Sequence, residues 1–237
     1  MRILSVNTYD RPGGAEKIAS ELTTRFELAG HSTALVVGKT GGGIAKFLIP
    51  QGRDYRPQNN IAPTPVGEEK RHLEYLEGIE DFNFPGTWDL LNLGFEETEL
   101  LHLHNLHGNY FDLRALPWLS KQVPTVLTLH DAWLTSGHCA HSIDCERWQT
   151  GCGRCPDLQI YPSVPADSTA FNWKRKVDIV SASRLHIVTP SKWLMDKFST
   201  SVLWPHFLST KVIPNGVDST VYFPGSKNES RMQSDLP

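Results

Sequence analysis

The sequence predicts an α/β protein with a doubly wound, parallel, Rossmann-like sheet. Short apolar runs alternate along the chain with segments whose apolar residues recur at helical spacing, which is the pattern of consecutive βα units. A glycine-rich turn follows the first apolar run, as at the opening of such a unit. The length of 237 residues suits one large domain or two small ones, with a well-buried core.

The first βα unit spans residues 3–28. The apolar run Ile3–Val6 predicts a strand, and helical spacing over residues 15–28 predicts a helix. Between them, Gly13 and Gly14 let the backbone approach a ligand, and the free N–H groups of a helix start attract an anion such as phosphate. A tight turn without a ligand is the alternative, since the dinucleotide fingerprint GxGxxG is absent.

The later elements follow the same alternation. Further strands are predicted at residues 32–37, 100–104, 125–129, 185–189 and 211–214, and helices at 67–79, 112–121, 167–182 and 191–198. Leu73 and Leu76 are expected on the inward side of the helix at 67–79. The basic run at residues 174–176 is expected to be a solvated face.

Two stretches depart from this alternation. Residues 43 to 65 combine many prolines with poor periodicity, which predicts an irregular, exposed insertion. Residues 225–237 are polar and aperiodic, as in a linker or a frayed chain end. We therefore expect a Rossmann-like domain at residues 1–224, followed by a tail.

Charge and hydropathy disfavour several classes of partner. The formal net charge is only −3, so no bulk attraction to nucleic acid is expected. The apolar run after Met1 is too short for a signal peptide, and no apolar run approaches the roughly 20 residues of a membrane span. We expect a cytoplasmic protein without a nucleic-acid partner, and peripheral contact with the inner face of the membrane stays open.

Histidines cluster in and after the strand predicted at residues 100–104. His102 and His104 share one face of that strand, so they could offer two ligands to a metal. No carboxylate or further donor is placed to complete such a site. The favoured interpretation is that both imidazoles are buried and hydrogen-bonded.

Polar residues directly follow two of the predicted strands. His107 lies in the loop after residue 104, and His130 and Asp131 follow the strand at 125–129. Because the carboxyl ends of parallel strands meet at one edge of the sheet, these side chains and Gly13–Gly14 are expected to share a rim. In open α/β sheets that rim holds the ligand, so it is the predicted active face.

All the cysteines of the chain lie in one segment. They are Cys139, Cys145, Cys152 and Cys155. The last pair encloses a glycine and precedes a proline, as in a knuckle around a tetrahedral metal. We favour a structural Zn²⁺ held by the four thiolates, with His138 or His141 as substitute ligands, while disulfides and free thiols stay open. A redox role is disfavoured because the pair does not lie at a βα junction.

The ordered motifs resemble the N-terminal domain of family 4 glycosyltransferases, most closely the bacterial colanic-acid and O-antigen polysaccharide type. They are Gly13-Gly14-Ala15-Glu16, His102-Leu103-His104-Asn105, His107-Gly108, Thr128-Leu129-His130-Asp131-Ala132-Trp133, the cysteine segment at 137–156, Thr189-Pro190-Ser191 and Val212-Ile213-Pro214-Asn215-Gly216-Val217-Asp218. The resemblance covers residues 1–224, and the ordered set is more specific than any single motif.

The resemblance implies a GT-B enzyme that transfers a sugar with retained configuration from a nucleotide-sugar to a glycan or lipid-linked acceptor. It places Gly13–Gly14 near the donor phosphate and His130 near the transferred sugar. His107 and Trp133 would belong to the acceptor side. Asp131 would orient His130 by accepting its ring N–H.

The resemblance also implies a C-terminal domain that holds the donor nucleotide, and the sequence stops near where that domain should begin. We therefore expect a truncated or split product, or a separate C-terminal domain as partner, and little transfer by this chain alone. A non-catalytic carbohydrate- or protein-binding module is the alternative function. A nicotinamide-dependent enzyme is disfavoured, since no acidic residue clearly ends the strand at 32–37.

Overall fold

The computed structural model describes residues 1–10, 13–52, 55–58 and 60–234. Its centre is a seven-stranded sheet in the order β3-β2-β1-β4-β5-β6-β7, with every neighbouring pair parallel. The strands are β1 (Arg2–Tyr9), β2 (Ser32–Lys39), β3 (Phe47–Leu48), β4 (Leu100–Leu103), β5 (Thr125–Thr128), β6 (Leu185–Thr189) and β7 (Ser209–Val212). The chain winds outward from β1 in both directions, which confirms the predicted doubly wound sheet.

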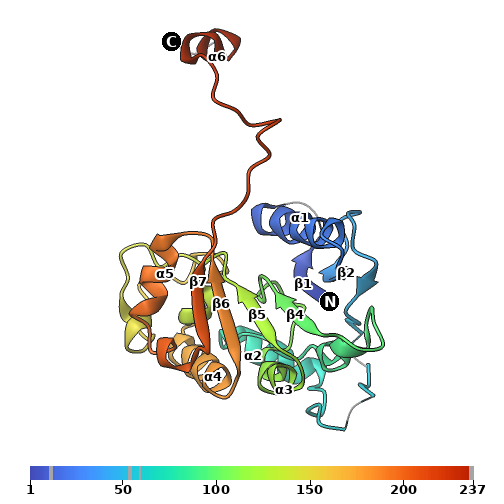
Figure 1. The fold of residues 1–237 in the computed structure, drawn as a ribbon. Helices are drawn as coiled ribbons and strands as arrows, with labels where there is room; N and C mark the ends of the chain where they lie inside the picture. Colours follow the sequence, from blue (N-terminus) through green and yellow to red (C-terminus); the bar gives the residue numbers. More distant parts are fainter. Residues whose placement is uncertain (11–12, 53–54, 59, 235–237) are drawn as a thin grey trace.

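The described residues form the helices α1 (Gly14–Leu28), α2 (Glu68–Leu76), α3 (Leu116–Gln122), α4 (Thr169–Ser181), α5 (Lys192–Ser199) and α6 (Lys227–Gln233). Those that pack on the sheet cover both of its faces. Figure 1 shows α1 on one face of the sheet and α3 and α4 on the other. Among the described residues, no helix combines the length and apolarity that crossing a bilayer requires.

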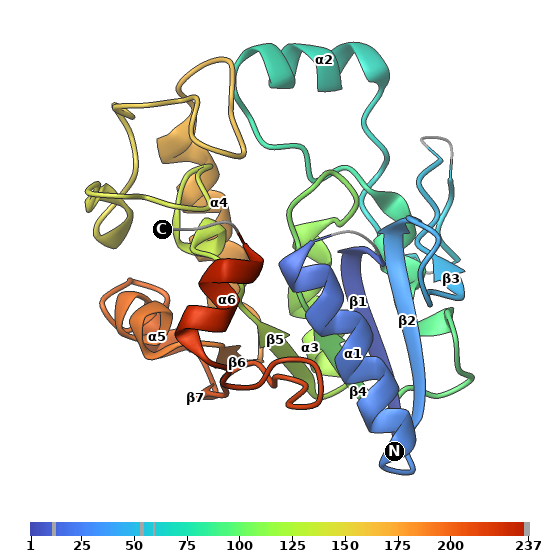
Figure 2. The same cartoon turned by 90° about the horizontal axis from the view of Figure 1, so that it is seen from above.

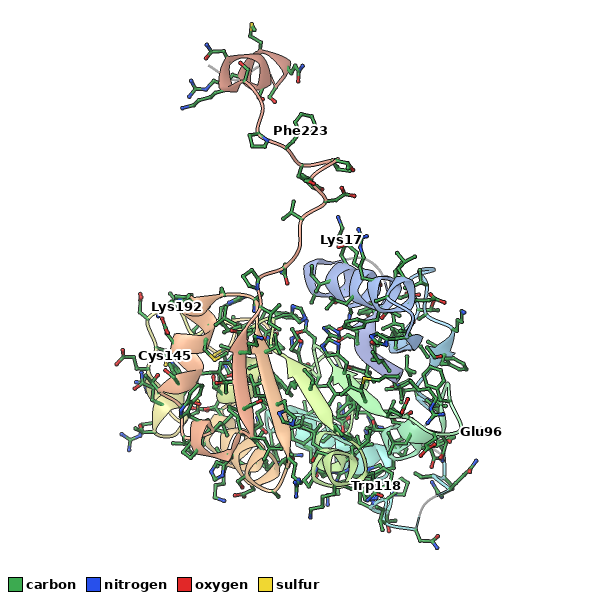
Figure 3. All side chains as sticks on the ribbon, viewed as in Figure 1. Lys17, Glu96, Trp118, Cys145, Lys192 and Phe223 are labelled. Atoms are coloured by element: carbon green, nitrogen blue, oxygen red, sulfur yellow. The ribbon has the colours of Figure 1, made fainter. Side chains whose placement is uncertain are left out.

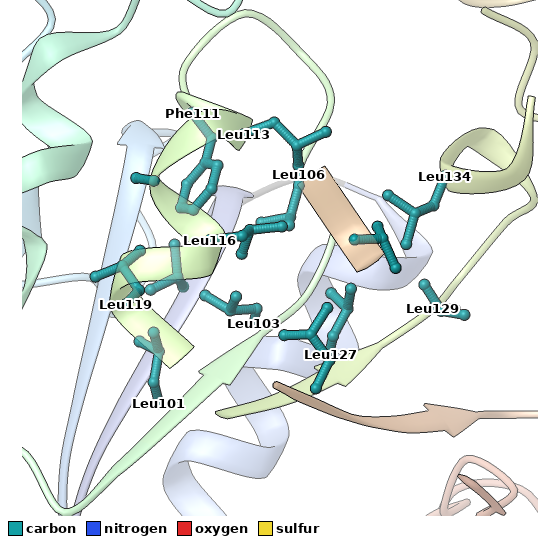
Figure 4. Close-up of a cluster of buried hydrophobic side chains, with 14 of the residues drawn as sticks. Leu101, Leu103, Leu106, Phe111, Leu113, Leu116, Leu119, Leu127, Leu129 and Leu134 are labelled. Carbon is teal, nitrogen blue, oxygen red and sulfur yellow. The ribbon is translucent and has the colours of Figure 1, made fainter. Parts of the chain in front are cut away.

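The main core lies between the sheet and α3. It gathers leucines of the central strands and of the helical segment that follows β4 (Figure 4): Leu101, Leu103, Leu113, Leu116, Leu119 and Leu127. Burying each such side chain stabilises the fold by about 1.5–3 kcal/mol. Because strand side chains alternate between faces, Leu101 and Leu103 of β4 point to α3, and His102 points to the opposite face.

Capping residues mark several of the helix ends. Asp112 begins the short helical turn Leu113–Ala115, where its carboxylate accepts from the Arg114 amide. Ser191 begins α5 in the same way, with its hydroxyl accepting from the Leu194 amide. Gly30 follows α1 at φ 87°, a conformation that glycine adopts without strain.

Helix α2 departs from the predicted burial. Leu73 and Leu76 were expected to point inward, yet they are 53% and 51% exposed, so that expectation is wrong. Figure 2 shows the reason: α2 lies beyond the carboxyl ends of the strands and does not pack on the sheet. The helix is anchored through Arg71, whose Nε donates to Asp81 Oδ2 at 2.9 Å. Helix α2 therefore forms a wall at the rim of the sheet and covers neither face of it.

The chain after β7 leaves the body of the domain. Figure 1 and Figure 3 show an extended segment that carries Phe223 away from the sheet and ends in α6. Within the tail predicted at residues 225–237, Lys227–Gln233 form the short helix α6. Residues 235–237 lie outside the described residues.

A buried ion pair ties α4 to the loops at the rim. Lys176 is fully buried, and its Nζ lies 2.8 Å from Glu80 Oε2. The same ammonium donates to the carbonyl oxygens of Trp133 and Ser136, at 3.2 and 3.1 Å. Burial lowers the pKa of Lys176, and the Glu80 carboxylate opposes that shift. One side chain thus joins a helix, the loop after β5 and the segment after α2.

This network corrects the prediction of a solvated basic face at residues 174–176. Helix α4 buries Asn172, Lys176 and Val180, which recur every four residues and form its inward face. Lys176 therefore points inward, while its neighbour Lys174 is exposed. The two lysines are close in the sequence, but the helical turn places them on different faces of α4.

Replacing Lys176 by methionine is expected to lower the free energy of unfolding by about 3–5 kcal/mol, because Glu80 is left buried without its counter-ion. Urea denaturation measures the loss. The matched control is Lys174→Met, which removes an exposed ion pair with Asp178 and should change stability by no more than about 0.5 kcal/mol. Equal losses in the two variants would contradict the role given to the buried pair.

Candidate active site

The predicted site residues lie at the carboxyl ends of three neighbouring strands. Gly13 and Gly14 follow β1, at the start of α1. His107 lies in the loop after β4, and His130 and Asp131 follow β5. Strands β1, β4 and β5 are adjacent in the sheet, so the topology brings these loops to a common rim, as expected from the sequence.

Hydrogen bonds of three histidines link the ends of β4 and β5 on the face of the sheet opposite the leucine core. His102 Nε2 lies 2.8 Å from Thr128 Oγ1, and His104 Nδ1 lies 3.0 Å from His130 Nε2. The rings of His104 and His130 stack, with centroids 5.3 Å apart. The predicted buried and hydrogen-bonded state of His102 and His104 is confirmed.

Burial sets the charge state of these histidines. It lowers the pKa of His102 to about 4, with the neighbouring His130 acting in the same direction. It also lowers the pKa of His130 to about 4, although Asp131 opposes the shift. The pKa of His104 lies well below its ordinary value for the same reason. Near neutral pH the three rings are uncharged, and each offers one donor and one acceptor.

A second pair joins the loops after β4 and β5. His107 Nε2 lies 2.8 Å from Asp131 Oδ2, and Asp131 Oδ1 accepts from the Trp133 amide at 2.9 Å. Burial alone would raise the pKa of Asp131, but the hydrogen bond and charge of His107, together with the Trp133 amide, outweigh it and lower the pKa. Asp131 is therefore ionised.

The expected pairing of Asp131 with His130 is wrong. The ring of His130 turns toward His104 on the neighbouring strand, so its Nε2 is engaged there. The loop after β4 then carries His107 back to Asp131. Two neighbouring residues of one loop thus bond to two different partners, and a sequence pattern alone does not distinguish between them.

Two ring nitrogens at this rim lack a protein partner. His104 Nε2 and His107 Nδ1 are buried without a hydrogen bond among the described residues. Both rings border a small cavity of about 20 Å³, as do His130 and Asp131. That volume is sufficient for one water molecule, which could serve such nitrogens.

A much larger cavity of about 610 Å³ lies between α2, the segment that follows it and the loop near residue 163. Its walls combine aromatic rings with charged groups: Arg71, Glu80, Asp81, Phe84, His107 and Trp133. The rings of His107 and Trp133 lie 5.5 Å apart between centroids, so these two predicted acceptor-side residues do come together. His130, Gly13 and Gly14 are not among the residues that line this cavity.

Trp133 is fixed by the buried ion pair. Its indole Nε1 donates to Glu80 Oε1 at 2.6 Å, and Lys176 Nζ lies 3.7 Å from the ring centre. The sequence pattern does not single out Glu80, Arg71 or Asp81 as site residues. The only signal was the aromatic run Phe82 to Phe84, which interrupts a polar region. Periodicity could not place these residues, because α2 lies off the sheet.

The first βα turn has the geometry of a close approach. Gly13 has φ 140°, and no side chain among the described residues caps the start of α1. Nothing lies within 4 Å of the position that a side chain at Gly14 would take. Asp10 holds the neighbouring glycine-rich loop, since its carboxylate accepts from the Gly41 amide at 2.5 Å. Asp10 is a further residue that the sequence pattern did not single out.

The cysteine segment forms a compact group beside this site. Cys139, Cys145, Cys152 and Cys155 all border one cavity of about 20 Å³. All four are free thiols, and burial raises the pKa of Cys152 to about 11. The described residues contain no ready-made group of three or more His, Cys, Asp or Glu side chains that could hold a metal ion.

The buried histidines predict that the folded protein loses stability as the pH falls. An unfolded histidine binds a proton near pH 6.5, whereas His102 and His130 stay neutral in the fold down to about pH 4. Each should therefore contribute a loss of about 1.4 kcal/mol per pH unit as the pH falls through that window. Urea denaturation over this range should show a shallower pH dependence in His102→Gln. The control is His72→Gln, which alters an exposed side chain of α2. If the control made the pH dependence of stability equally shallow, the buried histidines would not be its cause.

Comparison with known proteins supplies the family context. No family model matches the chain. The chain is 31% identical over 238 residues to the Escherichia coli (strain K12) protein "Putative colanic acid biosynthesis glycosyl transferase WcaC", and the match covers 92% of the chain. The chain spans about half, 55%, of the length of that relative. The resemblance that the motifs predicted is thereby confirmed, and the chain is a relative of the colanic-acid type of glycosyltransferase.

Proposed function

We propose that this chain is the acceptor-side part of a retaining glycosyltransferase in bacterial surface polysaccharide synthesis. The donor is a nucleotide-sugar, and the acceptor is a glycan or a lipid-linked glycan. The observation that carries the proposal is the junction of His107, Asp131 and Trp133 at the rim of the sheet, beside a cavity of about 610 Å³. The similarity to WcaC supports the same class of reaction.

The large cavity is the proposed acceptor site. Trp133 and Phe84 offer aromatic faces for the apolar side of a sugar ring, and Arg71, Glu80 and Asp81 offer charged partners for its hydroxyl groups. Such a mixture of a few polar groups on an apolar wall is typical of small-molecule sites. The volume admits a sugar unit of a larger acceptor while the rest of that molecule stays outside.

His107 would contact the acceptor hydroxyl in this site. Asp131 is ionised and can only accept, so His107 Nε2 donates in this bond. The bond fixes the orientation of the His107 ring, which lines the large cavity. A hydroxyl of the acceptor sugar would lie against this ring. In this scheme Asp131 is a positioning residue that acts through His107.

The donor side is proposed at the first turn and at His130. The uncapped start of α1, with Gly13 and Gly14, would meet the donor phosphates. His130, held by His104 and neutral near pH 7, would orient the transferred sugar through a hydrogen bond. In the family the nucleotide is held by a second domain. We therefore expect residues 1–237 alone to transfer sugar only slowly, and a C-terminal domain, joined or separate, to supply the remaining contacts.

His130→Ala should lower kcat by roughly 100-fold in an active two-domain enzyme reconstituted from this chain and a donor-binding domain, because a positioned polar contact near the reacting carbon is lost. Steady-state transfer rates from a panel of nucleotide-sugars measure the effect. The control is His186→Ala, which removes a histidine of β6 that bonds to Ser209. The binding-module alternative would gain support if sugar ligands bound while no pairing of donor and acceptor gave turnover.

His107→Ala should instead raise the KM for the acceptor by about tenfold, the loss expected for one hydrogen bond, with a smaller change in the KM for the donor. Asp131→Asn should act in the same direction, since its amide no longer fixes the ring of His107. Varying the acceptor at saturating donor separates the two constants. An unchanged acceptor KM in both variants would place the acceptor elsewhere.

A further inference from the structure

The four cysteines surround one small space. Although they are spread over residues 139–155, their side chains border a single cavity of about 20 Å³, whose walls also include Gly137 and Trp148. All four are free thiols and partly buried. A cavity of this size admits one water-sized guest, which is also the scale of a metal ion. Four sulfurs around such a space are the donor set of a tetrahedral thiolate site.

The backbone around the last two cysteines is bent in the way that a metal knuckle requires. Gly151 and Gly153 have φ angles of 146° and 131°, and Arg154 has φ 49°. Positive φ at a residue with a side chain is uncommon and costs conformational energy. The bends direct the thiols of Cys152 and Cys155 toward the same cavity. The segment thus adopts a backbone conformation that costs energy and that brings the sulfurs of Cys152 and Cys155 to one cavity.

Hydrogen-bond donors already point at two of the sulfurs. The Gly137 amide donates to Cys152 Sγ at 3.2 Å, and Arg147 Nη1 lies 3.8 Å from Cys145 Sγ. Cys155 Sγ lies 3.4 Å from His138 Nε2 and donates to the Asp157 carbonyl oxygen at 3.4 Å. The donors at Cys145 and Cys152 would also serve thiolates, which accept more strongly than thiols. Donors of this kind form the second shell that orients metal ligands.

Two lysines provide positive charge around the same cavity. Lys176 of α4 interacts electrostatically with Cys139 and Cys152, and Lys197 of α5 interacts with Cys139 and Cys145. Lys197 Nζ also donates to Ser142 Oγ at 2.5 Å, within the cysteine segment. A divalent zinc with four thiolates keeps two negative charges, and the Lys197 ammonium would offset part of them, whereas Lys176 is already paired with Glu80.

The two nearby histidines do not compete as ligands. His138 has both ring nitrogens engaged, with Nδ1 lying 2.8 Å from the Pro162 carbonyl oxygen and Nε2 directed at Cys155. His141 is exposed to solvent and is not among the residues of the cavity. Since the described residues hold no ready-made metal cluster, zinc binding would draw the sulfurs inward.

We propose that the four cysteines bind one Zn²⁺ as a closed tetrathiolate site, and that this ion fixes the wall of the large cavity. The connection is direct. The Ala132 amide donates to the Ala140 carbonyl at 2.9 Å, and the Ala140 amide donates to the Tyr161 carbonyl at 2.7 Å. The ring of Tyr161 packs edge-on against His107, with centroids 5.8 Å apart. With four protein ligands no coordination position is open, so the ion has a structural role.

Metal analysis of the purified full chain, prepared without a polyhistidine tag and under reducing conditions, tests the site directly. The expected result is about one zinc per chain, with the four thiols unreactive until a mercurial displaces the metal. Cobalt substitution should give the visible absorption of a tetrahedral thiolate complex. Substoichiometric zinc with four reactive thiols would overturn the proposal, as would a mass that shows disulfides in place of the metal.

Variants and amide exchange test the ligand set and the connection to the cavity. Cys152→Ser should lose the zinc, whereas His141→Ala should keep it. If Cys152→Ser does not fold, zinc removal from the wild-type chain replaces it and should lower the melting temperature by at least ~4 °C. The amides of Ala132 and Ala140 should then exchange faster by tenfold or more. Loss of zinc in His141→Ala would overturn the four-thiolate assignment, and unchanged exchange would overturn the connection to the cavity wall.

Discussion

The ion pair between Lys176 and Glu80 holds together the parts of the molecule that surround the site. The lysine reaches from α4 through the interior to two carbonyl oxygens of the loop after β5, and its partner carboxylate also receives the indole of Trp133. Burying two charges is costly, and the geometry offsets that cost only when the further hydrogen bonds are also made. A buried pair of this kind favours a single arrangement of α4, the loop after β5 and the segment after α2. The shape of the rim therefore depends on an ion pair in the interior of the domain.

The rim itself divides into two polar pairs with different electrostatics. His104 and His130 are neutral rings whose pKa is lowered by burial, whereas His107 faces an ionised Asp131. Each pair takes one member from the loop or strand end of β4 and one from that of β5. The neighbouring strands therefore have to keep their relative register for either pair to form. The parallel sheet supplies this register through backbone hydrogen bonds that do not depend on the side chains concerned.

Sequence patterns predicted the sheet and the rim because both rest on local periodicity and on a general rule of parallel sheets. Short apolar runs marked the strands, and strand ends marked Gly13, His107 and His130. The partners of Asp131 and the burial of Lys176 were not predictable in the same way. They depend on how loops fold back over one another, and such contacts join residues far apart in the chain. The wall made by α2 escaped prediction because its amphipathic pattern suggested a sheet-facing helix that the fold does not contain.

Strand β4 is only four residues long, and it directs Leu101 and Leu103 to the leucine core and His102 to the opposite face, where His104 continues the alternation just beyond the strand. Because the side chains of a strand alternate, an insertion or deletion of one residue within β4 would exchange the two sets. Imidazoles would then enter the leucine core, and leucines would occupy the positions from which His102 and His104 reach β5. The strand can thus vary by substitution but not by length. A change in length is tolerated only in the loops beyond the strand, so ligand contacts there can be altered without disturbing the two faces of β4.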